Sequence, residues 1–446
     1  MIIELHNFGP IERFTFDTEK RMHFIFGENN VGKSYAITAV YLILKNWEKF
    51  TRKNVNIYSD ILLNIKKKME TLEPSIDITM EFRNNMWFFI NDEFIPLINQ
   101  SFFNTFSSIQ DLSNKHSRKE FQIIIRENKS SIILNQKGNS ISFDFNFEKE
   151  FILKQDEEVK SSYIFEQSFI HLSSDEHWMS AFFSLNLYSY LWKIKYKFSD
   201  IFFLPASRSG IYNGLSAWSA ILVQLTQLRN QDKNTKFEIP ALTEPISDYF
   251  LNLTNIEKKA YSTSFSKFAK RLEDEIIKGK INFDKGNRKL FYEPSNLDIS
   301  LELSQASSMI SEIAPIIAHL KFIFANEDDT ENGRNYIFIE EPEAHLHPKV
   351  QVALIQLFAE MAKEGLHVVM TSHSNYMFNK LSNMVLAKEI APETISVGLM
   401  KLGKKGSYID ENAMHIDEDG IDDDNFSETA EALYNERLKL YEQNPS

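Results

Sequence analysis

A glycine-rich loop near the start of the chain lies between a short apolar stretch and a long one. The loop has the pattern G-x-x-x-x-G-K-S and consists of Gly27, Glu28, Asn29, Asn30, Val31, Gly32, Lys33 and Ser34. The apolar residues 22–26 before it predict a strand, and the nearly all-apolar residues 35–47 after it predict a buried helix. Backbone N–H groups at such a helix start converge on phosphate oxygens. We therefore predict that Lys33 reaches the β- and γ-phosphates of a nucleotide and that the Ser34 hydroxyl binds Mg²⁺.

Composition limits the other classes of protein. The chain has 446 residues, of which 43% are hydrophobic, and it contains no cysteine. It can bury a large core, whereas disulfide frameworks, thiol nucleophiles and thiolate zinc sites are excluded. It has no run of about 18 apolar residues and no basic stretch followed by an apolar one at its start, so we expect a cytoplasmic protein with no membrane contact.

The negative charge is concentrated near the end of the chain. Of the net charge of −13, residues 410–446 carry −10. The remainder is close to neutral, so a nucleic-acid footprint would be a local patch, with the lysines at 66–68 and 401–405 as candidates. The composition of this acidic segment predicts a solvated tail with a helix at 427–441. Alternatively, the segment mimics nucleic acid or docks a basic partner.

Apolar patterns outline the rest of the chain. Residues 76–150 read as antiparallel strands, because Ile76, Ile78, Met80 and Phe82 alternate with polar residues and Lys137-Gly138-Asn139 suits a hairpin turn. A strand at 201–204 precedes helical stretches at 215–228 and 256–277, and a second hairpin surrounds 284–287. Strands at 335–339 and 366–370 flank a helix at 350–361, which predicts a parallel βαβ unit.

Two adjacent acids follow the apolar strand at 336–339. Ligands of α/β sheets bind at the carboxyl ends of the strands. Adjacent acids there can divide the work, so we predict that Glu340 faces the metal and that Glu341 is the general base that positions a water. The next strand ends in Thr371-Ser372-His373, and we predict that His373 contacts the γ-phosphate or the attacking water. The alternatives are that Glu340 and Glu341 are ordinary surface acids and that His373 has a structural role.

These segments together resemble the ABC-type ATPases of the SMC and RecF kind, and within them the OLD-like group. The matching residues are 7–11, the glycine-rich loop, the strand end Ile339-Glu340-Glu341-Pro342-Glu343-Ala344-His345-Leu346-His347-Pro348, and Thr371-Ser372-His373-Ser374. The resemblance implies an α/β ABC-type P-loop ATPase head, which has a mixed sheet with an antiparallel β lobe, here with a helical insertion. It also implies four parts, namely an N-terminal ATPase lobe at 1–200, a central strand end and helical insertion at 201–297, a C-terminal ATPase lobe at 298–409 and an acidic tail at 410–446.

The resemblance further implies that ATP and Mg²⁺ are held between two copies of the chain in a homodimer or a higher homo-oligomer. The signature-like segment would be Ser304-Gln305-Ala306-Ser307-Ser308-Met309, with Ser307 or Ser308 as helix cap. Many relatives have glycine where Met309 stands, and Pro315 implies a kinked or shortened helix. His347 would orient the opposite nucleotide, although zinc binding by His345, His347 and Glu343 is an alternative. Arg208 would contact phosphate or the neighbouring subunit, and a surface salt bridge is the alternative.

The function implied is slow ATP hydrolysis that controls a partner. Only 73 residues follow His373, too few for the TOPRIM domain of OLD-family nucleases. The chain thus resembles stand-alone ATPase subunits of bacterial anti-phage systems of the Septu, retron-associated and PARIS types, which control a separately encoded nuclease or toxin effector. The alternatives are a RecF-like repair ATPase that binds DNA and a degenerate scaffold stabilised by nucleotide.

Overall fold

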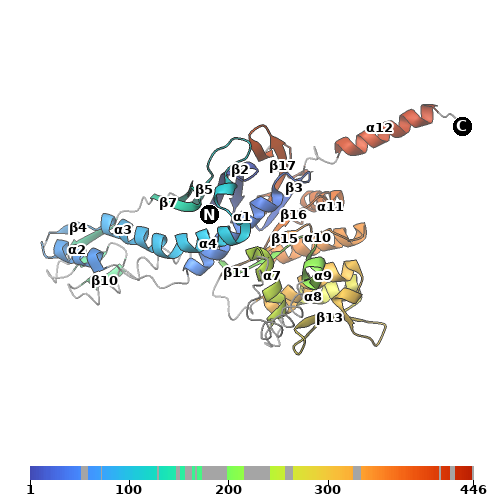
Figure 1. The fold of residues 1–446 in the computed structure, drawn as a ribbon, viewed down its shortest axis with the longest axis horizontal. Coiled ribbons are helices and arrows are strands. Elements are labelled where there is room, and N and C mark those ends of the chain that lie inside the picture. Colours follow the sequence, from blue (N-terminus) through green and yellow to red (C-terminus); the bar gives the residue numbers. More distant parts are fainter. Residues whose placement is uncertain are drawn as a thin grey trace, which may run out of the picture.

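An 11-stranded mixed sheet runs through the centre of the computed structural model (Figure 1). Its strand order is β11-β15-β16-β3-β17-β18-β2-β1-β5-β6-β7. The described residues are 1–51, 59–71, 73–127, 130–146, 151–155, 163–165, 168–172, 198–214, 242–256, 265–324, 333–410, 413–421 and 427–443. The predicted α/β class with an antiparallel lobe is confirmed.

The sheet has a parallel half and a mainly antiparallel half. The parallel half consists of β11 (Phe198–Leu204), β15 (Arg334–Glu340), β16 (Leu366–Thr371), β3 (Met22–Gly27) and β17 (Ile395–Gly403). The other half consists of β18 (Gly406–Asp410), β2 (Ile11–Asp17), β1 (Ile2–Phe8), β5 (Gln122–Glu127), β6 (Ser130–Lys137) and β7 (Ser140–Asn146), in which only the β18–β2 pair is parallel. Strands from both ends of the sequence share this one sheet, so the division into four parts stays a prediction.

Three smaller sheets complete the described strands. They are β4 (Ser75–Asp77), β8 (Ile152–Gln155), β9 (Tyr163–Phe165) and β10 (Ser168–Leu172); β12 (Gly279–Asp284), β13 (Lys289–Pro294) and β14 (Leu301–Glu302); and β19 (Ile416–Asp417) with β20 (Gly420–Ile421). The predicted hairpins are the antiparallel pairs β6–β7 and β12–β13.

The described α-helices are α1 (Lys33–Thr51), α2 (Ser59–Met69), α3 (Thr79–Phe89), α4 (Ile95–Phe106), α7 (Glu244–Thr254), α8 (Ser266–Arg271), α9 (Ser308–Ala318), α10 (Pro348–Lys363), α11 (Asn375–Leu386) and α12 (Ser427–Gln443). Three π-helical segments extend α3, α8 and α9, at Ile90–Phe94, Leu272–Ile277 and His319–Ile323. The helix predicted near the end of the chain is α12, which lies apart from the sheet (Figure 1). No helix in the described part of the chain is long and apolar enough to cross a bilayer.

Two hydrophobic cores lie on opposite faces of the sheet, because successive side chains of a strand point to opposite faces. On β15, Tyr336 and Phe338 join the core that contains α1, α3 and α4. Ile337 and Ile339 join the core built with α7 to α11. This alternation decides where the acids at the end of β15 point.

One sequence expectation about secondary structure is wrong, and one strand was not predicted. Residues 79–106, expected as strands, form α3, the π-helical segment Ile90–Phe94 and α4. The buried residues Ile78, Phe82 and Met86 recur at the helical spacing of four, whereas Met80 is 58% exposed. Strand β2, which the sequence reading missed, forms a hairpin with β1 at the Gly9-Pro10 turn.

Other expectations lie only partly within the described residues. The helix expected at 215–228 lies outside them. Of the stretch 256–277, the described part contains α8 and the π-helical Leu272–Ile277.

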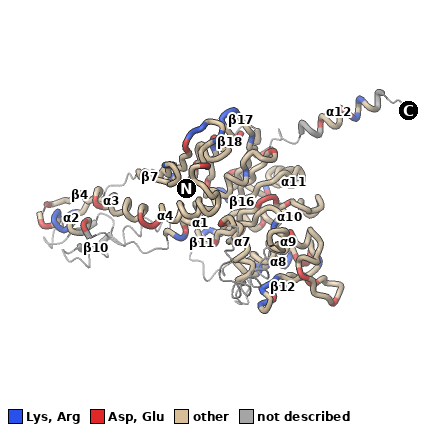
Figure 2. Tube along the Cα trace, viewed as in Figure 1, with Lys and Arg blue, Asp and Glu red and all other residues tan. Residues whose placement is uncertain are grey.

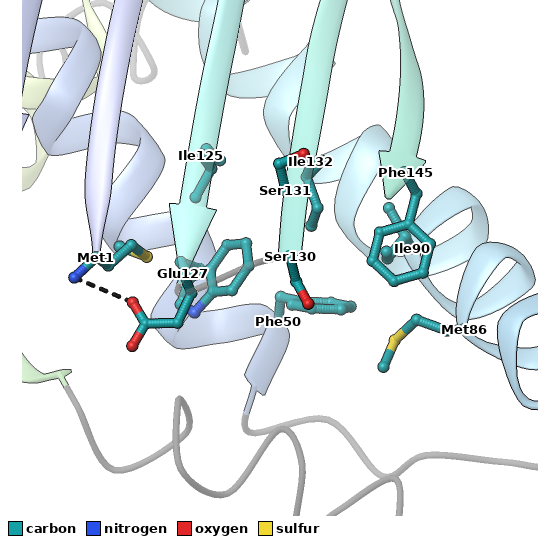
Figure 3. A pocket seen from close by; sticks show the side chains of 11 residues that line it. Met1, Phe50, Met86, Ile90, Ile125, Glu127, Ser130, Ser131, Ile132 and Phe145 are labelled. Atoms are coloured by element: carbon teal, nitrogen blue, oxygen red, sulfur yellow. Dashed lines mark ion pairs between the residues drawn. The ribbon is translucent and has the colours of Figure 1, made fainter. Parts of the chain in front are cut away.

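A small cavity of about 40 Å³ lies under strands β5 to β7 (Figure 3). Its walls are mainly apolar and include Phe50, Met86 and Phe145. The Met1 ammonium group pairs with the Glu127 carboxylate at 3.0 Å on its rim. None of the lining residues belongs to the glycine-rich loop or to the acidic strand end, so this cavity is separate from the site described next.

Candidate nucleotide-binding site

The three segments that the sequence singled out meet at one edge of the sheet. Strands β15, β16 and β3 are parallel neighbours, with Glu340 opposite Thr371 and Thr371 opposite Ile25. Their carboxyl ends therefore point the same way. The edge brings together the glycine-rich loop after β3, the acids at the end of β15 and His373 after β16.

The glycine-rich loop is shaped by close backbone contacts. Gly27 has φ +141°, and a Cβ atom there would lie 2.4 Å from the Met400 carbonyl oxygen. Gly32 has φ +94°, and a Cβ atom there would lie 2.8 Å from Pro10. Because L side chains rarely adopt such φ values, both positions need glycine. The result is a compact cradle of backbone at the start of α1.

Lys33 is buried in this cradle. Its Nζ donates hydrogen bonds to the carbonyl oxygens of Gly27, at 3.0 Å, and Glu28, at 2.7 Å. Burial lowers the pKa of Lys33 to about 8, and the carboxylates of Glu341 and Glu343 oppose this shift. Within the described part of the chain, this buried ammonium group bonds to neutral carbonyls, so it is suited to receive an anion.

Ser34 and Glu340 are in contact, as expected for a shared metal site. Glu340 lies two residues after Phe338, so it points to the face of β15 that packs against α1. There it hydrogen-bonds with the Ser34 side chain, and its Oε2 accepts a hydrogen bond from the Ala206 N–H at 3.2 Å. Burial raises the pKa of Glu340, and these two hydrogen bonds oppose the shift. A hydroxyl and a carboxylate are ligands that Mg²⁺ prefers.

Glu341 and His373 lie side by side at the open side of the site. His373 Nε2 is 3.8 Å from Glu341 Oε1, and the two side chains are 32% and 44% exposed. Glu341 has the left-handed φ of +44°, and its N–H donates to the Thr371 carbonyl at 3.0 Å. Non-glycine residues in this conformation are strained and gather at functional sites. Burial and the nearby Lys33 charge lower the pKa of His373, so its neutral form is favoured.

Glu343 contributes to the site in a way that the sequence reading missed. Its Oε1 accepts hydrogen bonds from the Ser372 hydroxyl at 2.9 Å and from the His373 N–H at 2.6 Å. Its Oε2 is buried and has no hydrogen-bond partner among the described residues. Glu343 thereby fixes the loop of His373 to the acidic strand end. Its place in the quoted motif was the available signal, but only the fold shows which loop it binds.

Arg208 lies inside the fold. Its side chain is fully buried, and its guanidinium group bonds to Glu312 and to backbone carbonyls at the end of β15. Because the side chain is buried, a surface salt bridge is excluded. The contact of Arg208 with phosphate or with the neighbouring subunit stays a prediction.

The residues assigned to the dimer interface have local contacts. Ser307 is the N-cap of α9, and its hydroxyl accepts a hydrogen bond from the Ile310 N–H at 3.4 Å. The helix continues through Pro315 to Ala318 and then becomes π-helical. Ser307, Ser308 and His347 are exposed, and His347 caps α10 through Nδ1, which accepts from the Lys349 N–H at 3.2 Å. Their roles across an interface stay predictions.

The zinc alternative has no support in the described residues, where no group of three or more His, Cys, Asp or Glu side chains could hold a metal ion. The donors present instead fit a magnesium nucleotide. A glycine cradle, a buried ammonium group and a hydroxyl–carboxylate pair lie together at the carboxyl ends of strands in the parallel half of the sheet.

This fold and this site define a P-loop nucleotide-binding protein. The profile of the AAA ATPase domain family matches residues 1–378. The chain belongs to that family. A search of curated proteins found no match.

Several solved structures are similar to this chain at low identity. The SMC head domain from Thermotoga maritima is 10% identical with a TM-score of 0.34, over 92% of this chain and 97% of that chain. An SmcHead bound to the C-winged helix domain of ScpA is 10% identical with a TM-score of 0.40, over 92% and 96%. An Smc head domain with an extended coiled coil, bound to the C-terminal domain of ScpA derived from Pyrococcus furiosus, is 11% identical with a TM-score of 0.39, over 98% of both chains.

Proposed function

We propose that this protein binds ATP with Mg²⁺ and hydrolyses it slowly. One observation carries the proposal. The glycine-rich loop with Lys33, the acid Glu341 and His373 follow three neighbouring parallel strands, and His373 Nε2 lies 3.8 Å from Glu341 Oε1.

Each residue of the site has a separate task in this proposal. Mg²⁺, when bound, neutralises phosphate charge. Ser34 and Glu340 hold the metal, and Lys33 pairs with the terminal phosphates. Glu341 orients the attacking water and accepts its proton, because its carboxylate is partly exposed and its backbone is fixed by the bond to Thr371. Neutral His373 donates a hydrogen bond to the phosphate or orients the water.

Two copies of the chain complete the site in this proposal. The motifs resemble ABC-type ATPases of the SMC and RecF kind, in which a signature helix of one subunit caps the nucleotide of the other. The exposed start of α9, at Ser307 and Ser308, offers backbone N–H groups and the positive end of a helix dipole. Exposed His347 lies on the loop that would cross the interface.

Two substitutions test the division of tasks. Lys33→Ala should weaken ATP binding about 10- to 100-fold, because a charge-assisted contact is lost. Glu341→Gln should bind ATP normally but lower kcat by about 10²- to 10⁴-fold, because proton transfer is lost. Calorimetry measures binding, and phosphate release measures turnover.

Lys49→Ala is the matched control, since Lys49 lies on the same helix but outside the loop and is 46% exposed. It should leave both quantities unchanged. Equal ATP retention by Lys33→Ala and wild type would contradict the proposal. Turnover by wild type equal to that of Glu341→Gln would favour the scaffold alternative.

We further propose that ATP binding controls a separately encoded nuclease or toxin effector in anti-phage defence. The support is the resemblance of the motifs to stand-alone ATPase subunits of such systems. A conformation favoured by ATP would shift the state of the bound effector.

Affinity purification of the protein with the products of its neighbouring genes tests this role. A nuclease or toxin that copurifies and changes activity with ATP is the expected result. Recombination genes as neighbours, with salt-sensitive DNA binding by the protein alone, would instead support the RecF-like alternative. Exposed Lys404 and Lys405, at the β17–β18 turn where Figure 2 shows positive charge, favour that alternative.

A further inference from the structure

Arg208 is a fully buried cation whose donors are directed at backbone. Its Nε donates to the Glu312 carbonyl at 3.0 Å, and its Nη1 donates to the Glu340 carbonyl at 2.9 Å. Its Nη2 donates to the carbonyls of Glu341, at 3.4 Å, and Pro342, at 3.5 Å. The guanidinium group thus joins α9 to Glu340, the last residue of β15, and to the two residues that follow it.

The charge of Arg208 is balanced within α9. Glu312 is also buried, and its Oε2 lies 3.3 Å from Arg208 Nε. Its Oε1 accepts a hydrogen bond from the Ser209 hydroxyl at 2.5 Å. The Arg208 carbonyl in turn accepts from the Tyr249 hydroxyl of α7 at 2.9 Å. Three elements therefore hold this arginine in place.

These contacts indicate that Arg208 does something other than stabilise the fold. A buried ion pair contributes little net stability compared with well-packed apolar residues. The planar fork of an arginine, in contrast, can hold several acceptors in fixed directions. Here the acceptors include the carbonyl of Glu341, whose backbone is in the strained left-handed region.

We propose that Arg208 is a positioning residue, which sets the orientation of the Glu341 carboxylate by clamping the backbone of residues 340–342 to α9. This rests on the proposed function, because Glu341 is the base of the proposed hydrolysis. The same clamp ties residues 340–342 to α9, whose first turn follows Ser307, so that these residues and α9 move together.

The test separates the clamp from the buried charge. Arg208→Met alone would leave the Glu312 carboxylate buried and unpaired, which destabilises the fold. The double variant Arg208→Met/Glu312→Gln removes both charges, and the amide oxygen that replaces the carboxylate can still accept from the Ser209 hydroxyl. We expect this variant to keep its melting temperature within a few degrees and its ATP affinity within about threefold, while kcat falls about 30- to 100-fold.

Amide hydrogen exchange gives a readout that does not depend on turnover. The N–H groups of Glu341, Ala344 and Leu346 are hydrogen-bonded in the present loop. Without the clamp, peptides that cover 341–346 should exchange about tenfold faster, while those of the β15 interior should not change.

Each outcome decides one of the two proposals. Wild-type kcat together with unchanged exchange in the double variant would overturn the positioning role. A loss of ATP affinity as large as the loss of kcat would also overturn the positioning role, because it would indicate that Arg208 has a general structural role. No turnover by wild-type protein would refute the proposed function, and the exchange data would still decide the clamp.

Should the double variant not fold, Arg208→Lys replaces it. Its ammonium group can pair with Glu312 but lacks the planar fork. A lower kcat at unchanged ATP affinity is again expected, and a wild-type kcat would overturn the proposal.

Discussion

Single residues of the site differ in how visible they are in the sequence. Five residues could be named in advance because their side chains suit phosphate or metal chemistry and their places in the sequence are recognisable. Lys33 and Ser34 end the glycine-rich pattern, Glu340 and Glu341 lie at the end of an apolar strand, and His373 lies two residues after another. The interior position of Arg208 could not, because its burial depends on α9, which lies about 100 residues further along the chain. The acceptors of that arginine are mostly backbone carbonyls, which leave no signal in the sequence.

Three buried histidines make the free energy of unfolding depend on pH. Burial lowers the pKa of His23 to about 3 and those of His319 and His367 to about 4, from an ordinary value of 6.5. Between these values the unfolded chain binds protons that the folded chain does not, so the free energy of unfolding falls as the pH drops from 6.5 towards 4. Each histidine contributes up to about 1.4 kcal/mol per pH unit.

Denaturant titrations from pH 7 to pH 4.5 measure this slope. His319→Leu should reduce the slope of the free energy of unfolding against pH by the contribution of one histidine. His116→Leu, at an exposed position, should leave it as in wild type. A slope that does not change in the His319 variant would refute the assignment.

At the level of elements, the predictions succeeded where one periodicity dominated. The strands β15 and β16 and the helices α1 and α10 have long apolar patterns of one kind. Residues 76–82 satisfy both a period of two and a helical spacing, so the pattern does not reveal that β4 ends at Asp77 and that α3 begins at Thr79. Strand β2 alternates only over its last five residues, Arg13 to Asp17, so its apolar pattern is short.

Helix α9 is the element whose role depends on a second copy of the chain. Ser308 is exposed in its first turn. If this turn caps the partner's nucleotide, Ser308→Trp should abolish ATP-dependent dimerisation in the Glu341→Gln background and leave ATP binding within about twofold, because a bulky ring separates the subunits. Light scattering with and without ATP measures the mass.

Asn383→Trp is the control for that experiment, because Asn383 is exposed on α11. It should dimerise normally. ATP-dependent dimers of Ser308→Trp would show that α9 does not form the interface.

At the scale of the whole molecule, the sheet order creates the site. The glycine-rich loop, Glu341 and His373 follow β3, β15 and β16, and the order β15-β16-β3 makes these strands neighbours. The βαβ pattern predicted the parallel pair β15–β16, since such crossovers link parallel strands. That β3 adds beside β16 depends on contacts across more than 300 residues, which no local pattern encodes.

A crystal structure of Glu341→Gln grown with Mn²⁺ and ATP would show where the metal and the nucleotide bind, because anomalous scattering locates Mn²⁺ in place of Mg²⁺. We expect an anomalous peak between the Ser34 hydroxyl and the Glu340 carboxylate, with the terminal phosphate at Lys33 and His373. A nucleotide bound elsewhere, or a metal peak away from Ser34 and Glu340, would contradict this expectation.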